Sequence, residues 1–562
     1  MADTKSCLQC HQSFTIRDKD EDFYRNISPQ IGEHILSVPT PTLCPECRLI
    51  RRLAARNETA LYLRKSSLTG KDIISMYSPE APYLVGEMTE LRKDGFDAMQ
   101  YQNDCDPKRA FFPQFHTFAC KVPHQALLNF GGQEAIEYNN FAYEAKNCYL
   151  CFWGDYGQDS MYNYGYVNLK NCINNFWLFD GELCFQCVNS QYCFRAQYVM
   201  NSENISDSAF IADCKHLDHC MFCVNLHHKK YCIWNKQYTK EEYFEQKKAY
   251  ATGSFAAWEK MAEEFANFVK TFPRRALRNF NVENCDQGDM NNNAKDCYVS
   301  FHMVEAERCC YGIDNMKAFN CYDCYGSVNM THCYECYAVV NCQHCLWSFD
   351  CYDSSDLYYC QSCRNSHDLF GCIGLKNKQY CIFNKEYTKS EYEKLLVELI
   401  NTMQQKGEWG EFFPSTISPF GYNESTAFEY FPTDKKSALQ RGYHWSDYIA
   451  PKPQVDKFIA ASDLPDDIQD APNELVDSAV ICVLSGRPFR ITKQELVFYR
   501  EFSLPLPRLH PDERRRALMR MKNPRKVRDA ICANCSKSTL TSFSSESEAI
   551  IYCELCYQAL LA

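Results

Sequence analysis

The sequence lacks long hydrophobic segments and lacks an excess of positive charge. No run of about 18 apolar residues predicts a membrane span, and the first residues, MADTKSCLQC, contain no apolar stretch of the secretory type. The 60 Lys and Arg residues are outnumbered by 71 Asp and Glu residues, which gives a formal net charge of -11. Such a charge disfavours attraction of the whole surface to nucleic acid or to an anionic membrane. We therefore expect a soluble, cytoplasmic protein without a membrane partner.

Several enzyme motifs are also missing. The chain has no Gly-rich phosphate loop, no nucleophile elbow and no H-E-x-x-H sequence. His302, His332, His344 and His367 lie among cysteines, but His332 and His344 fall at different positions of the repeat described below, so they form no recurring constellation. No catalytic residue is predicted, and an enzyme is the weaker class of hypothesis.

Cysteine, in contrast, is abundant, with 36 residues in a chain of 562. In a reducing compartment this number favours metal ligands or buried thiols over disulfides. The length exceeds that of one ordinary hydrophobic core, so several domains are expected.

Two segments consist of nine-residue repeats. Residues 296–385 divide without a gap into nonapeptides from DCYVSFHMV to NKQYCIFNK, and residues 147–236 divide in the same way from NCYLCFWGD to HKKYCIWNK. Most of their cysteines occupy the second or fifth position. A constant offset aligns the two arrays, since Cys148 falls on Cys297 (297 - 148 = 149) and Cys232 on Cys381. The pattern indicates an internal duplication.

The repeat predicts two β-solenoids in a mainly β, multi-domain protein. The fifth position is never charged when it is not Cys, as expected for a buried site. We expect two nonapeptides per coil, roughly 18 residues, with coils about 4.8 Å apart. Cys324, Cys342 and Cys360 would then form a ladder too wide for a disulfide or a single zinc ion. A core of stacked free thiols is favoured, while a metal or iron-sulfur array and disulfides remain alternatives.

A helix is expected after each array. Thr239 with Glu242, and Thr388 with Glu391, have the T-x-x-E spacing of a helix-capping box. The chain after Gly407 is rich in Pro, aromatic and acidic residues without a sustained period, which predicts a long connector. The predicted organisation is a zinc-ribbon-like module (1–100), a connector (101–146), solenoid 1 (147–236), a helical linker (237–295), solenoid 2 (296–385), a helix (386–407), an extended connector (408–478) and a second zinc-ribbon-like module (479–562).

The two ends of the chain resemble each other. CHQSFTIRDKDEDFYR near the N-terminus matches SGRPFRITKQELVFYR near the C-terminus, with Phe14 on Phe489 (489 - 14 = 475). After a nine-residue interruption the offset becomes 466, which places Ser66 on Cys532 and Thr69 on Cys535 (532 - 66 = 466). The pattern indicates a duplicated module that flanks the solenoids, with two possible metal sites in each copy.

Each copy keeps four cysteines at only one of these sites. Two C-x-x-C knuckles per site are typical of a tetrahedral zinc site, so two zinc ions per chain are predicted. The predicted ligands are Cys7, Cys10, Cys44 and Cys47 in the first copy, and Cys532, Cys535, Cys553 and Cys556 in the second. The corresponding positions of the opposite copies read Cys482, Ser485, His510 and Glu513, and Ser66, Thr69, Glu87 and Glu90. CLQCH also fits c-type haem attachment, which the absence of an export signal disfavours.

Each terminal module contains a basic segment. Arg48, Arg51 and Arg52 follow CPEC, and Arg514, Arg515, Arg516 and Arg520 lie in a second basic segment. Such segments could contact the phosphates of RNA or DNA, although a solvated helix face is the simpler interpretation.

Several segments resemble uncharacterised, cysteine-rich zinc-ribbon proteins from candidate-phyla bacteria: RDKDEDFYR, PTLCPECRLIRRLAARNE, GEWGEFFP, SPFGYNES, ITKQELVFYR and IIYCELCY. The resemblance implies cytosolic zinc-ribbon ends around a repeat body, and it implies no activity. We therefore predict a zinc-binding scaffold that holds an unidentified protein or nucleic acid on its solenoid surfaces. A nucleic-acid-associated or ribosome-associated zinc-ribbon protein is the alternative, and a metal or thiol-redox protein is the third hypothesis.

Overall fold

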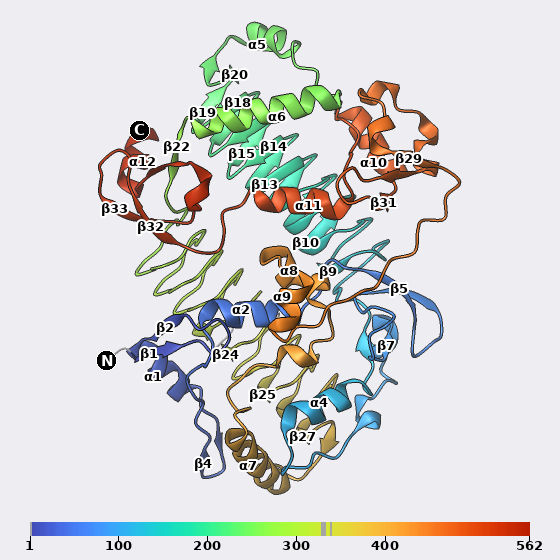
Figure 1. Ribbon diagram of the computed structural model, residues 1–562, viewed down its shortest axis with the longest axis vertical. Coiled ribbons are helices and arrows are strands. Elements are labelled where there is room, and N and C mark those ends of the chain that lie inside the picture. The colour runs from blue at the N-terminus through green and yellow to red at the C-terminus, as the bar shows by residue number, and fades with distance from the viewer. Residues whose placement is uncertain (1–2, 327–332, 338–339, 562) are drawn as a thin grey trace. The chain divides into compact units, whose positions relative to one another are not determined.

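A computed structural model describes residues 3–326, 333–337 and 340–561, and it is mainly β, with β-solenoid coils and few helices (Figure 1). His332 lies outside the described residues. The chain divides into two compact units. Unit 1 comprises Met1–Leu127, Leu277–Tyr448 and Arg525–Val527, and unit 2 comprises Leu128–Ala276, Ile449–Pro524 and Arg528–Ala562. Each unit therefore combines one solenoid with one end of the chain, and the finer domain boundaries remain predictions.

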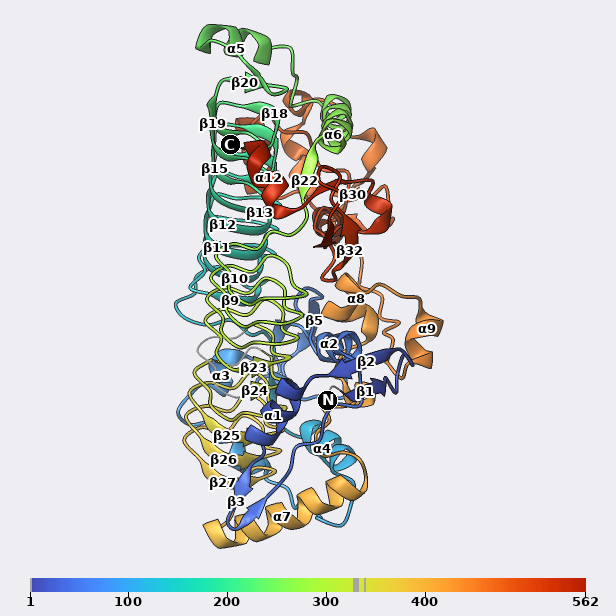
Figure 2. The ribbon, with the colours of Figure 1, turned by 90° about the vertical axis from the view of Figure 1, so that its left-hand side faces the viewer.

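The coils of both solenoids contain 12 residues. In unit 2, Phe152 pairs in parallel with Tyr164, which pairs with Phe176. In unit 1, the single bridges follow the same step, for example from Tyr298 to Cys310. The stacked strands of unit 2 can be followed from β9 to β19 in Figure 2. The predicted coil of 18 residues is therefore wrong.

The backbone explains why the coil is shorter than expected. Every third residue is left-handed, as at Asn168, Asn171 and Asn174, with φ values of 53°, 51° and 57°. Each left-handed residue turns the chain, so four three-residue sides close one coil. The nine-residue sequence repeat equals three such sides, and its period therefore differs from that of the coil. Asn and Asp tolerate this conformation better than most residues, which accounts for their frequency at the turns.

The turns also form ladders between coils. Asn147 donates from Nδ2 to Asp159 Oδ1, 12 residues on, at 2.6 Å. In unit 1, Asn341 makes the same bond to Asp353 at 2.9 Å. Side chains at equivalent turns thus stabilise the stack on the outside, while a different set of residues fills the interior.

The interior is narrow and rich in thiols. One residue in three points inward, and the buried sets combine cysteines with Ala, Val, Leu and Ile. Cys342 is fully buried and donates to the carbonyls of Val340 and Cys351, both at 3.4 Å. Cys172 bonds to Lys170 and Gly181 in the same way, both at 3.3 Å. A thiol therefore fills a small space and satisfies its own weak donor there.

This packing predicts how Cys342 tolerates substitution. Cys342→Ala should lower the unfolding free energy of unit 1 less than Cys342→Leu, because a larger side chain in a tight core costs about 1–3 kcal/mol. Chemical denaturation followed by circular dichroism measures the difference. Release of a bound metal from Cys342→Ala would contradict the thiol core and favour a metal array.

The strands of the unit 2 solenoid share one parallel sheet. They are β9 (Asn140–Tyr143), β10 (Phe152–Gln158), β11 (Tyr164–Lys170), β12 (Phe176–Glu182), β13 (Phe185–Phe194), β14 (Gln197–Met200), β15 (Glu203–Ser206), β16 (Ala209–Ala212), β17 (Lys215–Asp218), β18 (Met221–Val224), β19 (His227–Lys230) and β20 (Cys232–Ile233). Unit 1 has shorter strands, β23 (Cys321–Tyr322), β24 (Cys333–Tyr334), β25 (Ser355–Tyr358), β26 (His367–Phe370) and β27 (Gln379–Ile382), joined by isolated bridges.

Each solenoid ends in an antiparallel hairpin followed by a helix. Strands β21 (Lys236–Gln237) and β28 (Lys385–Glu386) fold back on the last coil. Helices α5 (Lys240–Lys247) and α7 (Lys389–Gln405) then begin with the predicted capping boxes at Thr239 and Thr388. Helix α6 (Phe255–Lys270) packs on the coils of unit 2. The expected helices after the arrays are confirmed.

The elements of the two chain ends agree at the offsets read from the sequence. Helix α1 (Asp18–Asn26) corresponds to α10 (Lys493–Glu501) at 475, and α2 (Pro45–Ala54) to α11 (Pro511–Arg520) at 466. The hairpin β5–β6 (Tyr62–Lys65 and Asp72–Ser75) corresponds to β32–β33 (Arg528–Ile531 and Ser538–Thr541) at 466. The other elements of these ends are β1 (Asp3–Ser6), β2 (Ser13–Ile16), β3 (Gln30–Ile31), β4 (His34–Ile35), β7 (Val85–Gly86), α3 (Met88–Leu91), β8 (His124–Gln125), α4 (Phe111–Ala119), β22 (Pro273–Arg275), β30 (Ala479–Ile481), β31 (Pro488–Phe489), β34 (Ile550–Tyr552) and α12 (Glu554–Leu561).

Each end also contacts the solenoid of its unit in the same manner. Tyr311 donates its hydroxyl to Asp20 at 2.8 Å in unit 1, and Tyr162 donates to Glu495 at 2.9 Å in unit 2. The two tyrosines are related by the offset of the solenoids (311 - 162 = 149). The two carboxylates are related by the offset of the chain ends (495 - 20 = 475). The two units can therefore be compared residue by residue.

Residues 408–478 contain α8 (Thr426–Tyr430), α9 (Lys435–Gln440), β29 (Phe458–Ala460) and short 3-10 turns.

Within the described residues, no helix combines the length and the apolar character needed to cross a membrane.

Candidate metal centres

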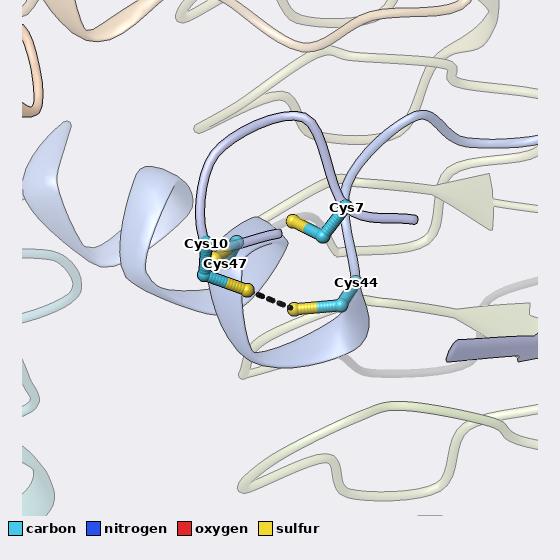
Figure 3. Close-up of side chains that lie close together, drawn as sticks. All are labelled: Cys7, Cys10, Cys44 and Cys47. Carbon is cyan, nitrogen blue, oxygen red and sulfur yellow. Dashed lines mark hydrogen bonds between the residues drawn. The ribbon is translucent and has the colours of Figure 1, made fainter. Parts of the chain in front are cut away.

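The first candidate centre brings together the four cysteines predicted near the N-terminus. The sulfur atoms of Cys7, Cys10, Cys44 and Cys47 all lie within 4.8 Å of one another (Figure 3). Cys10 Sγ and Cys44 Sγ are 3.7 Å apart. The first two cysteines follow β1, and the last two lie at the start of α2. This cluster could hold a metal ion.

The second candidate centre has the same form at the other end of the chain. Cys532, Cys535, Cys553 and Cys556 place their sulfur atoms within 4.8 Å of one another, and Cys535 Sγ lies 3.8 Å from Cys553 Sγ. The first pair occupies the turn between β32 and β33, and the second pair lies where β34 leads into α12. This cluster could also hold a metal ion.

The surroundings favour thiolate at one cysteine of each centre. The hydrogen bond with Cys47 is the largest cause that lowers the pKa of Cys44 to about 5. At Cys532, burial opposes ionisation, but the backbone N–H groups of Cys535 and Cys553 outweigh it and the pKa falls to about 6. The hydrogen bond that lowers the pKa of Cys44 also raises the pKa of Cys47, so one cysteine of each centre ionises readily and offers the thiolate form that binds a metal.

One turn geometry recurs at four places, including the two that lack four cysteines. In each turn the first residue donates its N–H to the carbonyl five residues on, and the residue four positions on is left-handed. The four bonds are Cys7 to Gln12 (2.9 Å), Ser66 to Lys71 (2.8 Å), Cys482 to Arg487 (3.0 Å) and Cys532 to Lys537 (2.9 Å), with φ values of 60° at His11, 73° at Gly70, 67° at Gly486 and 58° at Ser536.

Hydrogen bonds replace the cysteines at the site near Ser66. Ser66 Oγ donates to one oxygen of Glu87 at 2.5 Å, and Thr69 Oγ1 donates to the other. The same hydroxyl of Ser66 accepts from the N–H of Thr69 at 3.2 Å. The carboxylate thus bridges the two hydroxyl groups of the turn.

The site near Cys482 keeps a single cysteine. Its Sγ accepts from the N–H of Ser485 at 3.5 Å, and the side chain is 2% exposed. His510 caps α11 by accepting from the N–H of Asp512, and Glu513 pairs with Arg516 at 2.8 Å. The side chains of the site near Cys482 are therefore engaged in local contacts.

Several predicted nucleic-acid residues are buried in ion pairs. Arg48 and Arg52, each 1% exposed, contact Asp323 at 2.9 and 3.2 Å. Arg51 contacts Glu335 at 2.8 Å. A phosphate contact through these three side chains would require breaking the pairs that hold α2 against the solenoid.

The second basic segment is only partly available. Arg514 is 7% exposed and pairs with Glu495 at 2.8 Å, while Arg515 pairs with Asp512 at 3.1 Å. Arg516 is partly exposed, and Arg520 is exposed. Of the predicted contacts, Arg520 is therefore the best placed to meet a partner.

One group of possible ligands was missed from the sequence. Oxygen and nitrogen atoms of Asp207, Asp218 and His219 lie within 4.8 Å of one another on the unit 2 solenoid. Asp207 and His219 are 12 residues apart at consecutive turns, so the correct coil length would have revealed them. Arg195 and Lys230 pair with the two aspartates at 3.0 and 3.1 Å, which disfavours a cation there.

Comparison of the chain with protein-family models, with curated proteins and with solved structures finds no match.

Proposed function

We propose that the chain is a zinc-stabilised binding scaffold without catalytic activity, built from duplicated zinc-ribbon-like modules and solenoids. The observation that carries the proposal is the closed form of the two four-cysteine centres. Four protein ligands fill a tetrahedral zinc site, whereas catalytic zinc keeps one position for water or substrate. The centres therefore suit structural ions.

The sulfur spacing supports zinc. Four Zn–S bonds of about 2.3 Å in a tetrahedron separate the sulfur atoms by about 3.8 Å. The measured separations are 3.7 Å between Cys10 and Cys44 and 3.8 Å between Cys535 and Cys553. All eight ligands are thiolate donors, which zinc accepts readily. Iron also binds four thiolates, and elemental analysis distinguishes the two metals.

The solenoids support the scaffold part of the proposal. Most of their cysteines are directed into the core, where they are shielded from solvent. A redox-active cysteine has to be accessible to its partner, so this burial weakens the thiol-redox hypothesis. The outer face is regular and carries exposed aromatic residues such as Tyr156 and Tyr192, a surface type that repeat proteins use to hold partners.

Elemental analysis of the purified protein tests this proposal. We expect two zinc ions per chain, together with a count under denaturing, chelating conditions that finds all 36 cysteines as free thiols. Iron, or more than two metal ions, would favour the metal or redox hypothesis instead.

A nucleic-acid assay separates the scaffold from the alternative function. With most predicted arginines in ion pairs, we expect no saturable binding of a 30-nucleotide RNA or duplex DNA in about 50 mM salt, measured by fluorescence anisotropy. Binding that weakens steeply with salt, and whose salt slope flattens in an Arg516→Gln, Arg520→Gln variant, would establish the alternative.

A further inference from the structure

Unit 2 contains a cavity of about 210 Å³ between its solenoid, helix α6 and its C-terminal module. Solenoid residues Asn174, Phe185 and Gln186 form one wall. Helix α6 contributes three residues and the C-terminal module contributes the rest. These are Phe255, Trp258, Glu259, Val483, Tyr499, Pro505, Leu506, Pro507, Arg508, Leu509 and Arg514.

Aromatic rings form the inner part of this cavity. The ring of Phe185 lies 5.8 Å from that of Trp258 and 6.0 Å from that of Tyr499, in edge-to-face arrangements. Rings arranged in this way offer both faces and edges to a planar guest. The cavity therefore suits an aromatic or large apolar side chain.

Two charges of opposite sign border the cavity without forming an ion pair with other residues. Arg508 donates to the backbone carbonyls of Ala461, Leu464 and Pro465 and lies over the ring of Phe255. Neither Arg508 nor Glu259 forms an ion pair in the described part of the chain, although the negative charge of Asp466 acts on Arg508 and partly opposes the lowering of its pKa by burial. A guest with one positive and one negative group would complement both.

The corresponding place in unit 1 carries charged residues where unit 2 carries neutral amides. The offset of 149 places Asp323 and Glu335 at the positions of Asn174 and Gln186. In unit 1 these carboxylates pair with three arginines of α2. In unit 2 the amides replace the carboxylates, and the counterparts of Arg51 and Arg52 are Ala517 and Leu518 (517 - 51 = 466).

Arg514, the third basic position of this comparison, is already neutralised within unit 2. Arg514, the counterpart of Arg48, donates to Glu495 at 2.8 Å and to the hydroxyl of Tyr499 at 3.2 Å. The charges left to a guest are therefore those of Arg508 and Glu259, with neutral amides between them.

We propose that this cavity binds a zwitterionic amino acid with an aromatic side chain. The ring packs against Phe185 and Trp258, the carboxylate meets Arg508, and the ammonium group meets Glu259. Both polar contacts are charge-assisted, and the aromatic walls shield the ring of the guest from water while Glu259 meets the ammonium group at the exposed rim. The site adds a small-molecule ligand to a protein otherwise assigned a scaffold role.

Calorimetric titration with three ligands of matched shape tests the proposal. L-phenylalanine carries both charges, 3-phenylpropanoate lacks the ammonium group, and 2-phenylethylamine lacks the carboxylate. We expect L-phenylalanine to bind about tenfold or more tightly than either analogue, as loss of a charge-assisted hydrogen bond implies. No binding of L-phenylalanine, or equal binding of all three, would overturn the proposal.

Two variants assign the contacts. Glu259→Gln should weaken L-phenylalanine to the level of 3-phenylpropanoate and leave 3-phenylpropanoate unchanged. Arg508→Gln should weaken L-phenylalanine to the level of 2-phenylethylamine and leave the affinity for 2-phenylethylamine unchanged. Arg508→Lys, which keeps the charge, should retain part of the affinity for L-phenylalanine. Because Glu259 is exposed, its variant is expected to fold even if a change at Arg508 disturbs the backbone bonds. An unchanged preference in Glu259→Gln would contradict the assigned site.

Discussion

Replacing Cys553 by serine is expected to remove one of the two proposed metal ions from the chain and to leave the other in place. Cys553 lies in the C-terminal cluster, with Sγ 3.8 Å from that of Cys535, and its N–H donates to Cys532 Sγ at 3.3 Å. A serine hydroxyl is a poor replacement for a thiolate ligand. Since the binding free energy of a structural zinc ion stabilises its own small domain, this segment should loosen locally.

The loss should be confined to the elements around the cluster. Strand β34 pairs with β22, and Arg275 contacts Glu554 at 2.5 Å. The backbone amides of these segments should therefore show faster hydrogen exchange. The coils of both solenoids contain their own cores and should keep their protection.

Two matched variants control this experiment. Cys44→Ser should remove only the N-terminal ion, and Cys482→Ser should remove neither, because its turn lacks three further cysteines. Metal content by elemental analysis distinguishes the three variants. Loss of both ions from Cys553→Ser, or of one ion from Cys482→Ser, would contradict two independent centres.

The sequence predicted the four-cysteine centres because knuckle spacing determines them locally. Cys532 and Cys535 lie in one turn and Cys553 and Cys556 at the start of α12, so only the meeting of these two segments had to be inferred. The helix starts at Thr239 and Thr388 were predictable for the same reason, since a capping box involves residues three positions apart.

The coil length could not be read from the cysteines. Inward positions recur every three residues, so any multiple of three fits the cysteine pattern, and the nine-residue repeat of the sequence suggested a longer coil. The left-handed turns decide the length, and residues with side chains as different as Trp177 and Asn171 adopt them. Only the pairing of coils, such as Phe152 with Tyr164, identifies the step of 12.

The role of the arginines was equally hidden. Arg48 and Asp323 are 275 residues apart, and neither the charge run in α2 nor the repeat indicates that they meet. A cluster of arginines after a zinc knuckle therefore suggested phosphate contact, whereas the structure directs these side chains inward. Their burial makes the stability of unit 1 depend on the carboxylates that they contact.

Replacing Asp323 by alanine is expected to lower the unfolding free energy of unit 1 by about 3–5 kcal/mol, because it leaves buried guanidinium groups without their counter-charge. Asp323 is fully buried and contacts Arg48 at 2.9 Å and Arg52 at 3.2 Å. Since the chain has two compact units, a single unfolding transition would average over both. Hydrogen exchange of α2 and the adjoining coils measures the local effect, with unit 2 as the internal reference.

Unit 2 supplies the matched rescue for this variant. It carries Asn174 and Leu518 at the positions of Asp323 and Arg52, and its buried Arg514 pairs with Glu495 instead. Asp323→Asn alone should therefore destabilise unit 1, whereas adding Arg52→Leu should recover part of the loss by removing one of the two cations that Asp323 pairs with. Arg52 also lies 3.7 Å from Glu335, which keeps Arg51 as its partner in the double variant. If Arg52→Leu instead adds its own full cost to that of Asp323→Asn, the three side chains do not act as one charge network, and the burial of these arginines would need another explanation.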